Sequence, residues 1–121
     1  MTEVLDFINF EMDMAEIPYE FGEWQSEVRY PYFVGSYTET GYRYEDNCTE
    51  GIFVLDGWSR NSLEELMQVD EKIKEIFRDL QAVKYGRFFY VRYCTSTPVQ
   101  TGVEGLFRIN ITLNISEWKG E

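Results

Sequence analysis

The last part of the chain alternates so strictly between apolar and polar side chains that it constrains the fold more than any other segment. Within FRINITLNIS every second position is apolar: Phe107, Ile109, Ile111, Leu113 and Ile115. Successive side chains of a β-strand point to opposite faces, so this pattern predicts a strand with one face in the core. A shift of one residue would expose all five apolar side chains, and we therefore expect the register of this strand to be tightly defined.

Further strands are predicted where aromatic and β-branched residues gather, because these side chains pack well on a pleated surface. Such segments lie at residues 19–24, 30–38, 51–58 and 87–95. The polar, acidic stretch 37–50 predicts a hairpin whose tip projects from the sheet. A second long connection is expected at 95–105, where Pro98, Gly102 and Gly105 interrupt the strand pattern.

Two segments have the periodicity of helices. In residues 2–14, apolar side chains recur near helical spacing, which predicts a short N-terminal helix. The main helix is expected over LEELMQVDEKIKEIF, where apolar residues form one face. Ser62 and Glu65 have the S-x-x-E spacing of a capping box, in which the hydroxyl accepts an amide proton and the glutamate reaches back. This helix is expected to lie across the sheet.

Together these elements predict one α+β domain that spans residues 1–121. The expected architecture is a mostly antiparallel twisted sheet of about four to five strands, packed by one main helix, plus a short N-terminal helix. A chain of 121 residues is long enough for a single core, and no repeat or linker divides it.

The charge of the chain restricts its partners. Twenty-two acidic residues against 11 basic ones give a formal net charge of −11, which repels phosphates and argues against nucleic-acid binding through a basic patch. Three interpretations of the acidity stay open: solubility alone, a channel past which DNA slides without sticking, or a mimic of DNA phosphates. No apolar stretch approaches the roughly 20 residues that span a bilayer, so no membrane association is expected.

The residues needed for common catalytic sites are missing. The chain has no histidine, which excludes Ser-His-Asp, Cys-His and histidine-ligated metal chemistry. Cys48 and Cys94 lack CxxC spacing and are interpreted as reduced thiols. Glu45, Asp46 and Glu50 are hard-cation candidates, although we favour a solvated loop because the EF-hand spacing is absent. We therefore expect no enzyme activity, no metal and no cofactor.

Asp56 and Trp58 in FVLDGWSR deserve separate interpretations. Asp56 is either a catalytic carboxylate or an acceptor of backbone hydrogen bonds where the strand turns toward the helix, and the second role is favoured. Trp58 is expected to be a packing anchor and not a ligand stacker. Neither residue alters the expectation of a non-enzymatic protein.

The order of these segments resembles a known family. IPYEFGEW is followed by YPYFVGSY, a projecting hairpin, FVLDGWSR, the helix LEELMQVDEKIKEIF and two terminal strands. From about Val4 to Trp118 this is similar to the tail-completion proteins of phages and prophages, which include tail terminators and head–tail joining proteins. The resemblance supplies no catalytic residue.

The family resemblance implies a mechanical role. It implies a homo-oligomeric ring, often hexameric, at the head-proximal end of the tail, where it ends tail-tube growth. It also implies tail-tube and head-connector proteins as partners, with DNA only passing through. The protein would then be found in the host cytoplasm during assembly and afterwards in the tail or neck of the virion.

The two connections are the candidate assembly surfaces, with ordinary surface loops as the alternative. The candidate residues are Tyr42, Tyr44, Glu45 and Asp46 in the hairpin, and Thr97, Pro98 and Gly102 in the second connection. Two other functions stay open from the sequence. One is an acidic inhibitor that mimics DNA, and the other is a small enzyme or ligand-binding α+β domain with an aromatic pocket.

Overall fold

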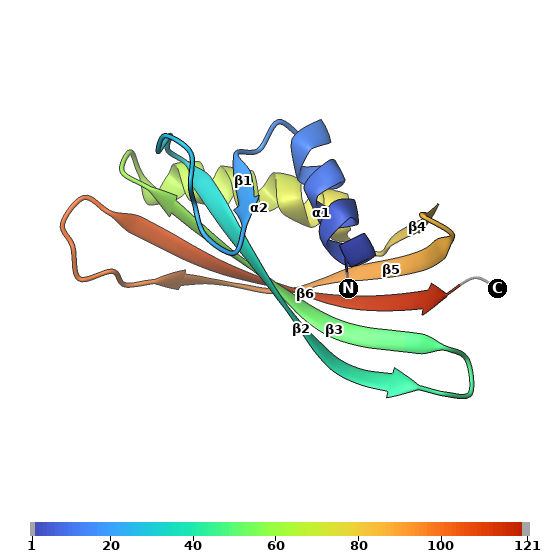
Figure 1. Cartoon of the computed structure of the whole chain (residues 1–121). Helices are drawn as coiled ribbons and strands as arrows, with labels where there is room; N and C mark the ends of the chain where they lie inside the picture. The colour runs from blue at the N-terminus through green and yellow to red at the C-terminus, as the bar shows by residue number, and fades with distance from the viewer. Residues whose placement is uncertain (1, 120–121) are drawn as a thin grey trace.

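In a computed structural model, which describes residues 2–119, these residues form a six-stranded sheet with two helices on one face (Figure 1). The first half contains α1 (Thr2–Met14), β1 (Tyr19–Phe21), β2 (Tyr32–Arg43) and β3 (Cys48–Ser59). The second half contains α2 (Leu63–Phe77), β4 (Leu80–Lys84), β5 (Arg87–Val99) and β6 (Phe107–Lys119). The strand order is β1-β2-β3-β6-β5-β4.

The predicted fold class is wrong in the number of strands, their direction and the number of packing helices. The sheet is a curled, mixed half-barrel in which β1 pairs parallel with β2, and the other neighbouring strands are antiparallel. The unexpected strand is β4, which begins three residues after α2 ends and is only five residues long. α1 also buries apolar residues against the sheet, so two helices pack on it.

The strict alternation near the C-terminus is confirmed as β6. Ile109, Ile111, Leu113 and Ile115 are at most 1% exposed and face the helices. Phe107, at the end of the strand, is only partly buried. Because β6 lies between β3 and β5, its apolar face lines the centre of the core and its polar face lies on the other side of the sheet.

The start of α2 confirms half of the predicted capping box. The Ser62 hydroxyl accepts a hydrogen bond from the backbone N–H of Glu65 at 3.1 Å. The Glu65 carboxylate instead accepts a hydrogen bond from the Ser59 hydroxyl at 3.3 Å. The glutamate therefore ties the beginning of α2 to the last residue of β3.

α1 is fixed to the sheet by stacking and by an ion-pair bridge. The rings of Phe7 and Phe89 stack with centroids 4.7 Å apart. The Arg87 guanidinium lies 3.2 Å from a carboxylate oxygen of Glu3 and 3.0 Å from one of Glu117. Glu117 is 2% exposed, so Arg87 neutralises a buried charge while it joins α1 to β5 and β6.

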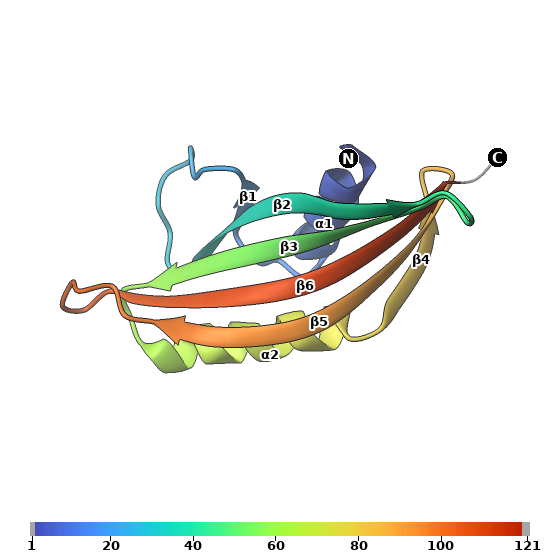
Figure 2. The ribbon, with the colours of Figure 1, turned by 90° about the horizontal axis from the view of Figure 1, so that it is seen from below.

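The opposite face of the sheet carries no helix (Figure 2). Its residues follow from the alternation and register of the four long strands, and they are mainly aromatic at the two ends and hydroxyl or amide side chains between. They are Tyr32, Val34, Ser36, Thr38, Gly41 and Arg43 of β2; Cys48, Glu50, Ile52, Val54, Asp56 and Trp58 of β3; Arg108, Asn110, Thr112, Asn114, Ser116 and Trp118 of β6; and Phe88, Tyr90, Arg92, Thr95, Thr97 and Val99 of β5. We call this surface the open face.

Candidate assembly surfaces

The first candidate surface, the β2–β3 hairpin, is built differently from the prediction. β2 continues through Arg43 and β3 begins at Cys48, so the turn comprises only residues 44–47 within the expected 37–50. Residues 38–43 of β2 are all exposed and therefore lack the apolar alternation by which a half-buried strand is detected. The two strands of the hairpin are long and the turn between them is short, and β3 also pairs with β6 along its whole length.

A charged network braces the tip of the hairpin. Arg43 lies 3.1 Å from an Asp46 carboxylate oxygen and 3.0 Å from one of Glu50. The indole N–H of Trp118, from β6, donates to Asp46 at 3.2 Å. The Trp118 hydrogen bond and then the Arg43 hydrogen bond lower the pKa of Asp46. Asp46 therefore connects the tip with the end of the neighbouring strand.

Two tyrosines dominate the outer surface of the tip. Tyr42 and Tyr44 meet edge to face with ring centroids 4.7 Å apart, and the Tyr42 hydroxyl donates to Asn47 Oδ1 at 2.6 Å. Tyr44 is 85% exposed, and Glu45 beside it is exposed too. The four predicted hairpin residues, Asp46 among them, thus lie together on one braced projection that presents an aromatic ring to solvent.

The acidic residues of the hairpin do not form a metal site. Across residues 2–119 no group of three or more histidine, cysteine or acidic side chains is arranged to hold an ion. Asp46 and Glu50 both face Arg43. Glu45 and Asp46 lie in the exposed turn, whereas Glu50 is a strand residue of β3.

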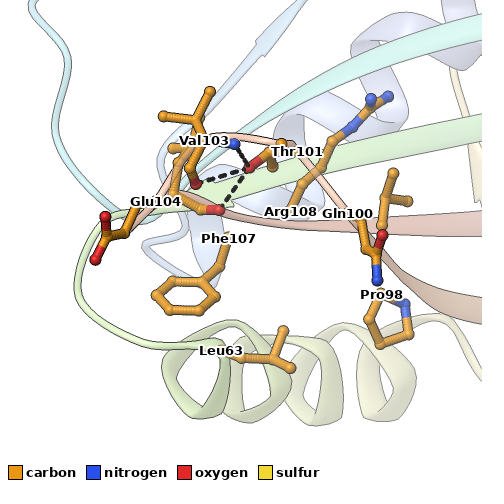
Figure 3. A pocket seen from close by; sticks show the side chains of 11 residues that line it. Leu63, Pro98, Gln100, Thr101, Val103, Glu104, Phe107 and Arg108 are labelled. Carbon is orange, nitrogen blue, oxygen red and sulfur yellow. Dashed lines mark hydrogen bonds between the residues drawn. The ribbon is translucent and has the colours of Figure 1, made fainter.

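The second candidate surface is shorter than predicted. β5 continues through Val99, so Thr97 and Pro98 are strand residues and only residues 100–106 connect β5 with β6. The Thr101 hydroxyl accepts from the backbone N–H of Val103 at 3.1 Å and donates to the carbonyl of Leu106 at 2.9 Å (Figure 3). Gly102 follows with a φ of 74°, a conformation that favours glycine. The hydrogen bonds of the Thr101 side chain therefore stabilise the conformation of this β5–β6 loop.

An open cavity of about 600 Å³ lies between the β5–β6 loop and the start of α2. The ring of Phe107 lies over Leu63, whereas the side chains of Glu104 and Arg108 point to different sides (Figure 3). Arg108 instead lies 2.9 Å from Asp56. The polar groups in this view do not converge on one point, as they would in a catalytic site.

Asp56 and Trp58 have structural partners on the open face. Asp56 Oδ1 accepts hydrogen bonds from Arg108 and Asn110, both at 2.9 Å. The donors are side chains of β6, not the backbone donors that the sequence suggested. Trp58 stacks on Tyr32 with ring centroids 5.3 Å apart, in agreement with a packing role.

The hairpin tip and the β5–β6 loop lie at opposite ends of the sheet (Figures 1 and 2). The two groups of predicted residues are therefore not brought together into one site. Each end of the elongated sheet instead carries its own projecting surface.

Two further surfaces are the unpaired parts of the sheet edges, whose residues the sequence did not define. β1 pairs only with Phe33–Gly35, so residues 36–43 of β2 have no outer strand neighbour among residues 2–119. β4 pairs only with Arg87–Val91, so residues 92–99 of β5 are uncovered in the same way. We call these segments the β2 edge (residues 36–43) and the β5 edge (residues 92–99). Only the lengths of β1 and β4 reveal them, and the sequence did not define these lengths.

Comparison with models of known protein families and with curated proteins finds no match for this chain. Neither helix within residues 2–119 has the length and apolar character required to cross a membrane.

Proposed function

We propose that this chain is a structural protein of a phage or prophage that forms a ring at the head-proximal end of the tail. There it ends tail-tube growth and joins the tail to the head connector. The observation that carries the proposal is the position of the hairpin tip and the β5–β6 loop at opposite ends of one sheet. A subunit of this shape offers one end to the tail tube and the other to the connector, while the sides contact neighbouring copies.

The charge distribution supports a protein that DNA passes without being held. The net charge is −11, and three of the arginines on the sheet are engaged by carboxylates: Arg43, Arg87 and Arg108. A phosphate-binding patch requires accessible cations, which these pairs reduce. The same pairs weaken the alternative of a DNA mimic, because Asp46 and Asp56 are neutralised by neighbouring arginines.

The proposal is tested by measuring particle mass and shape. Light scattering over a concentration series, with negative-stain imaging of the largest species, is expected to reveal closed rings with a central hole. Addition of purified tail tubes or connectors is expected to shift the protein into rings. A monomer at every concentration that also binds neither partner would contradict the proposal.

Variants at the two ends make the test more specific. Tyr44→Ser changes the hairpin tip and Val103→Ser changes the β5–β6 loop, and both residues are exposed in the structure. Each variant is expected to form rings but to lose binding to one of the two partners, tail tube or connector. The two variants serve as matched controls for each other, because each removes one apolar side chain from one end.

A further inference from the structure

The β2 edge and the β5 edge have the same length and complementary positions. Each contains eight residues, 36–43 and 92–99. The β2 edge lies toward the hairpin end of the sheet, since β1 covers the other part of β2. The β5 edge lies toward the β5–β6 loop, since β4 covers the part of β5 near the hairpin end. The sheet therefore has one unpaired edge segment on each side, and the two segments lie toward opposite ends of the sheet.

The directions of the two edges permit antiparallel pairing between copies. β2, β3, β6 and β5 are each antiparallel to the next, so β2 and β5 run in opposite directions within one sheet. A second copy in the same orientation would place its β2 edge antiparallel to the β5 edge of the first. In that position β4 of the first copy lies beyond one end of the β2 edge, and β1 of the second lies beyond the end of the β5 edge. β4 and β1 therefore do not occupy the positions that the two paired edges need.

The irregularities of the two edges also coincide. The β2 register shifts between Glu39 and Gly41, and the β5 register shifts between Tyr93 and Thr95. Each shift leaves one extra residue, Thr40 or Cys94. When residues 36–43 pair with residues 92–99 from end to end, Cys94 lies opposite residue 41 and next to residue 40. A bulge on one strand thus meets a bulge on the other.

The offset between the two copies matches the geometry of closed β-barrels. Within one sheet Tyr32 is level with Val99, through Trp58 and Arg108. In the paired arrangement Ser36 is opposite Val99, which displaces the second copy by four residues, or about 13 Å. Each copy contributes four long strands, so the shear is one residue per strand. An eight-stranded barrel with a shear of eight has the same ratio, with a strand tilt of about 36°.

We infer that the β2 edge of one copy pairs antiparallel with the β5 edge of the next, so that the sheets of neighbouring copies become continuous. This inference names the contact that closes the proposed ring and rests on the proposed function. The contact is heterologous, because each copy uses a different edge toward each neighbour. Backbone hydrogen bonds supply the attraction, as in other cases of strand addition.

The competing interpretation is that the two bulges protect the edges from any pairing, which is a common role of bulges in edge strands. Cross-linking distinguishes the two interpretations because Cys94 is an exposed thiol on the β5 edge, whereas Cys48 is buried. β2 and β5 of one copy are separated by three strand spacings, about 14 Å. Disulfides need Cα atoms within roughly 7 Å, so a link between the edges can form only between copies.

The test uses Thr40→Cys and Gly41→Cys in the full chain, with Val83→Cys as a matched control. Val83 lies on β4 and is exposed, but the proposed pairing keeps it away from Cys94 of the neighbour. After mild oxidation, one or both β2 variants are expected to form a ladder of dimers, trimers and larger species. Their cross-linking should be at least about tenfold faster than that of Val83→Cys, because pairing raises the local thiol concentration. Peptide mapping should identify the link to Cys94, and the reduced variants should melt at the wild-type temperature.

Three outcomes would overturn the inference. The first is equal cross-linking of the control and the β2 variants, which indicates random collision. The second is a dominant Cys94–Cys94 dimer of the wild-type chain, which indicates symmetric pairing of two β5 edges. The third is the absence of any link to Cys94 from positions 40 and 41. If rings form without this link, only the edge pairing fails; if neither rings nor links form, the proposed function fails as well.

Discussion

Replacement of Arg87 by methionine tests how strongly α1 is tied to the sheet. The substitution preserves most of the aliphatic volume but leaves Glu117, which is 2% exposed, without its 3.0 Å partner. Removing one member of a buried ion pair typically costs about 3–5 kcal/mol, because a charge stays buried without compensation. With an unfolding entropy of about 2.1 cal/mol/K per residue, a chain of this length should melt about 12–20 °C lower.

Thermal and urea unfolding of the purified variants measure this loss. Glu3→Gln removes the other carboxylate of the bridge, whose side chain is partly exposed, and should have a much smaller effect. The double variant Arg87→Met with Glu117→Met should recover part of the stability, because no isolated charge is left. If Arg87→Met lowers the free energy of unfolding by less than about 1 kcal/mol, the reasoning is refuted, because the fold would then tolerate the buried Glu117 carboxylate without a charged partner.

Two further predictions concern the sheet and the hairpin tip. Gly57→Ala should destabilise the fold by about 1–3 kcal/mol, because the new methyl group would lie 2.3 Å from the buried Phe33 ring. Gly41→Ala is the control: it has open space around it and should leave the melting temperature nearly unchanged. Because the pKa of Asp46 is lowered in the folded chain, its stabilising effect should be complete above the ordinary aspartate range and disappear as the pH falls through the lowered pKa. The NMR signal of the Trp118 indole N–H should report this transition, and Asp46→Asn should abolish it.

The elements that the sequence predicted well are those with a buried face. The apolar positions of β6 and the N-cap of α2 each have a local signal, an alternation in one case and a hydroxyl three residues before Glu65 in the other. The outer part of β2 has no such signal. Its residues 38–43 are exposed, so nothing in their order separates a strand from a polar loop. The sequence predicted a hairpin over 37–50 but not that its first strand continues to Arg43.

The errors in the predicted sheet have a different cause. β4 contains only five residues and none of them is fully buried, so LQAVK reads as the end of the preceding helix. The parallel pairing of β1 with β2 is a tertiary feature that three residues cannot specify. The positions of the two free edges depend on these short strands. An open sheet implies free edge strands, but the residues of the β2 edge and the β5 edge could not be predicted from the sequence.

The proposed edge pairing also changes the expectation for the channel wall. α1 and α2 lie on one face of the sheet and carry many of the acidic residues, so a ring with the helices outside would line its channel with the open face. For six copies with four long strands each, the backbone of such a barrel would be about 45 Å across. Its wall would consist mainly of the hydroxyl and amide side chains of β6 and its neighbours, with few charges of both signs. Because phosphate binding requires accessible cations, this nearly neutral wall suits DNA passage as well as the acidic wall that net charge alone suggested.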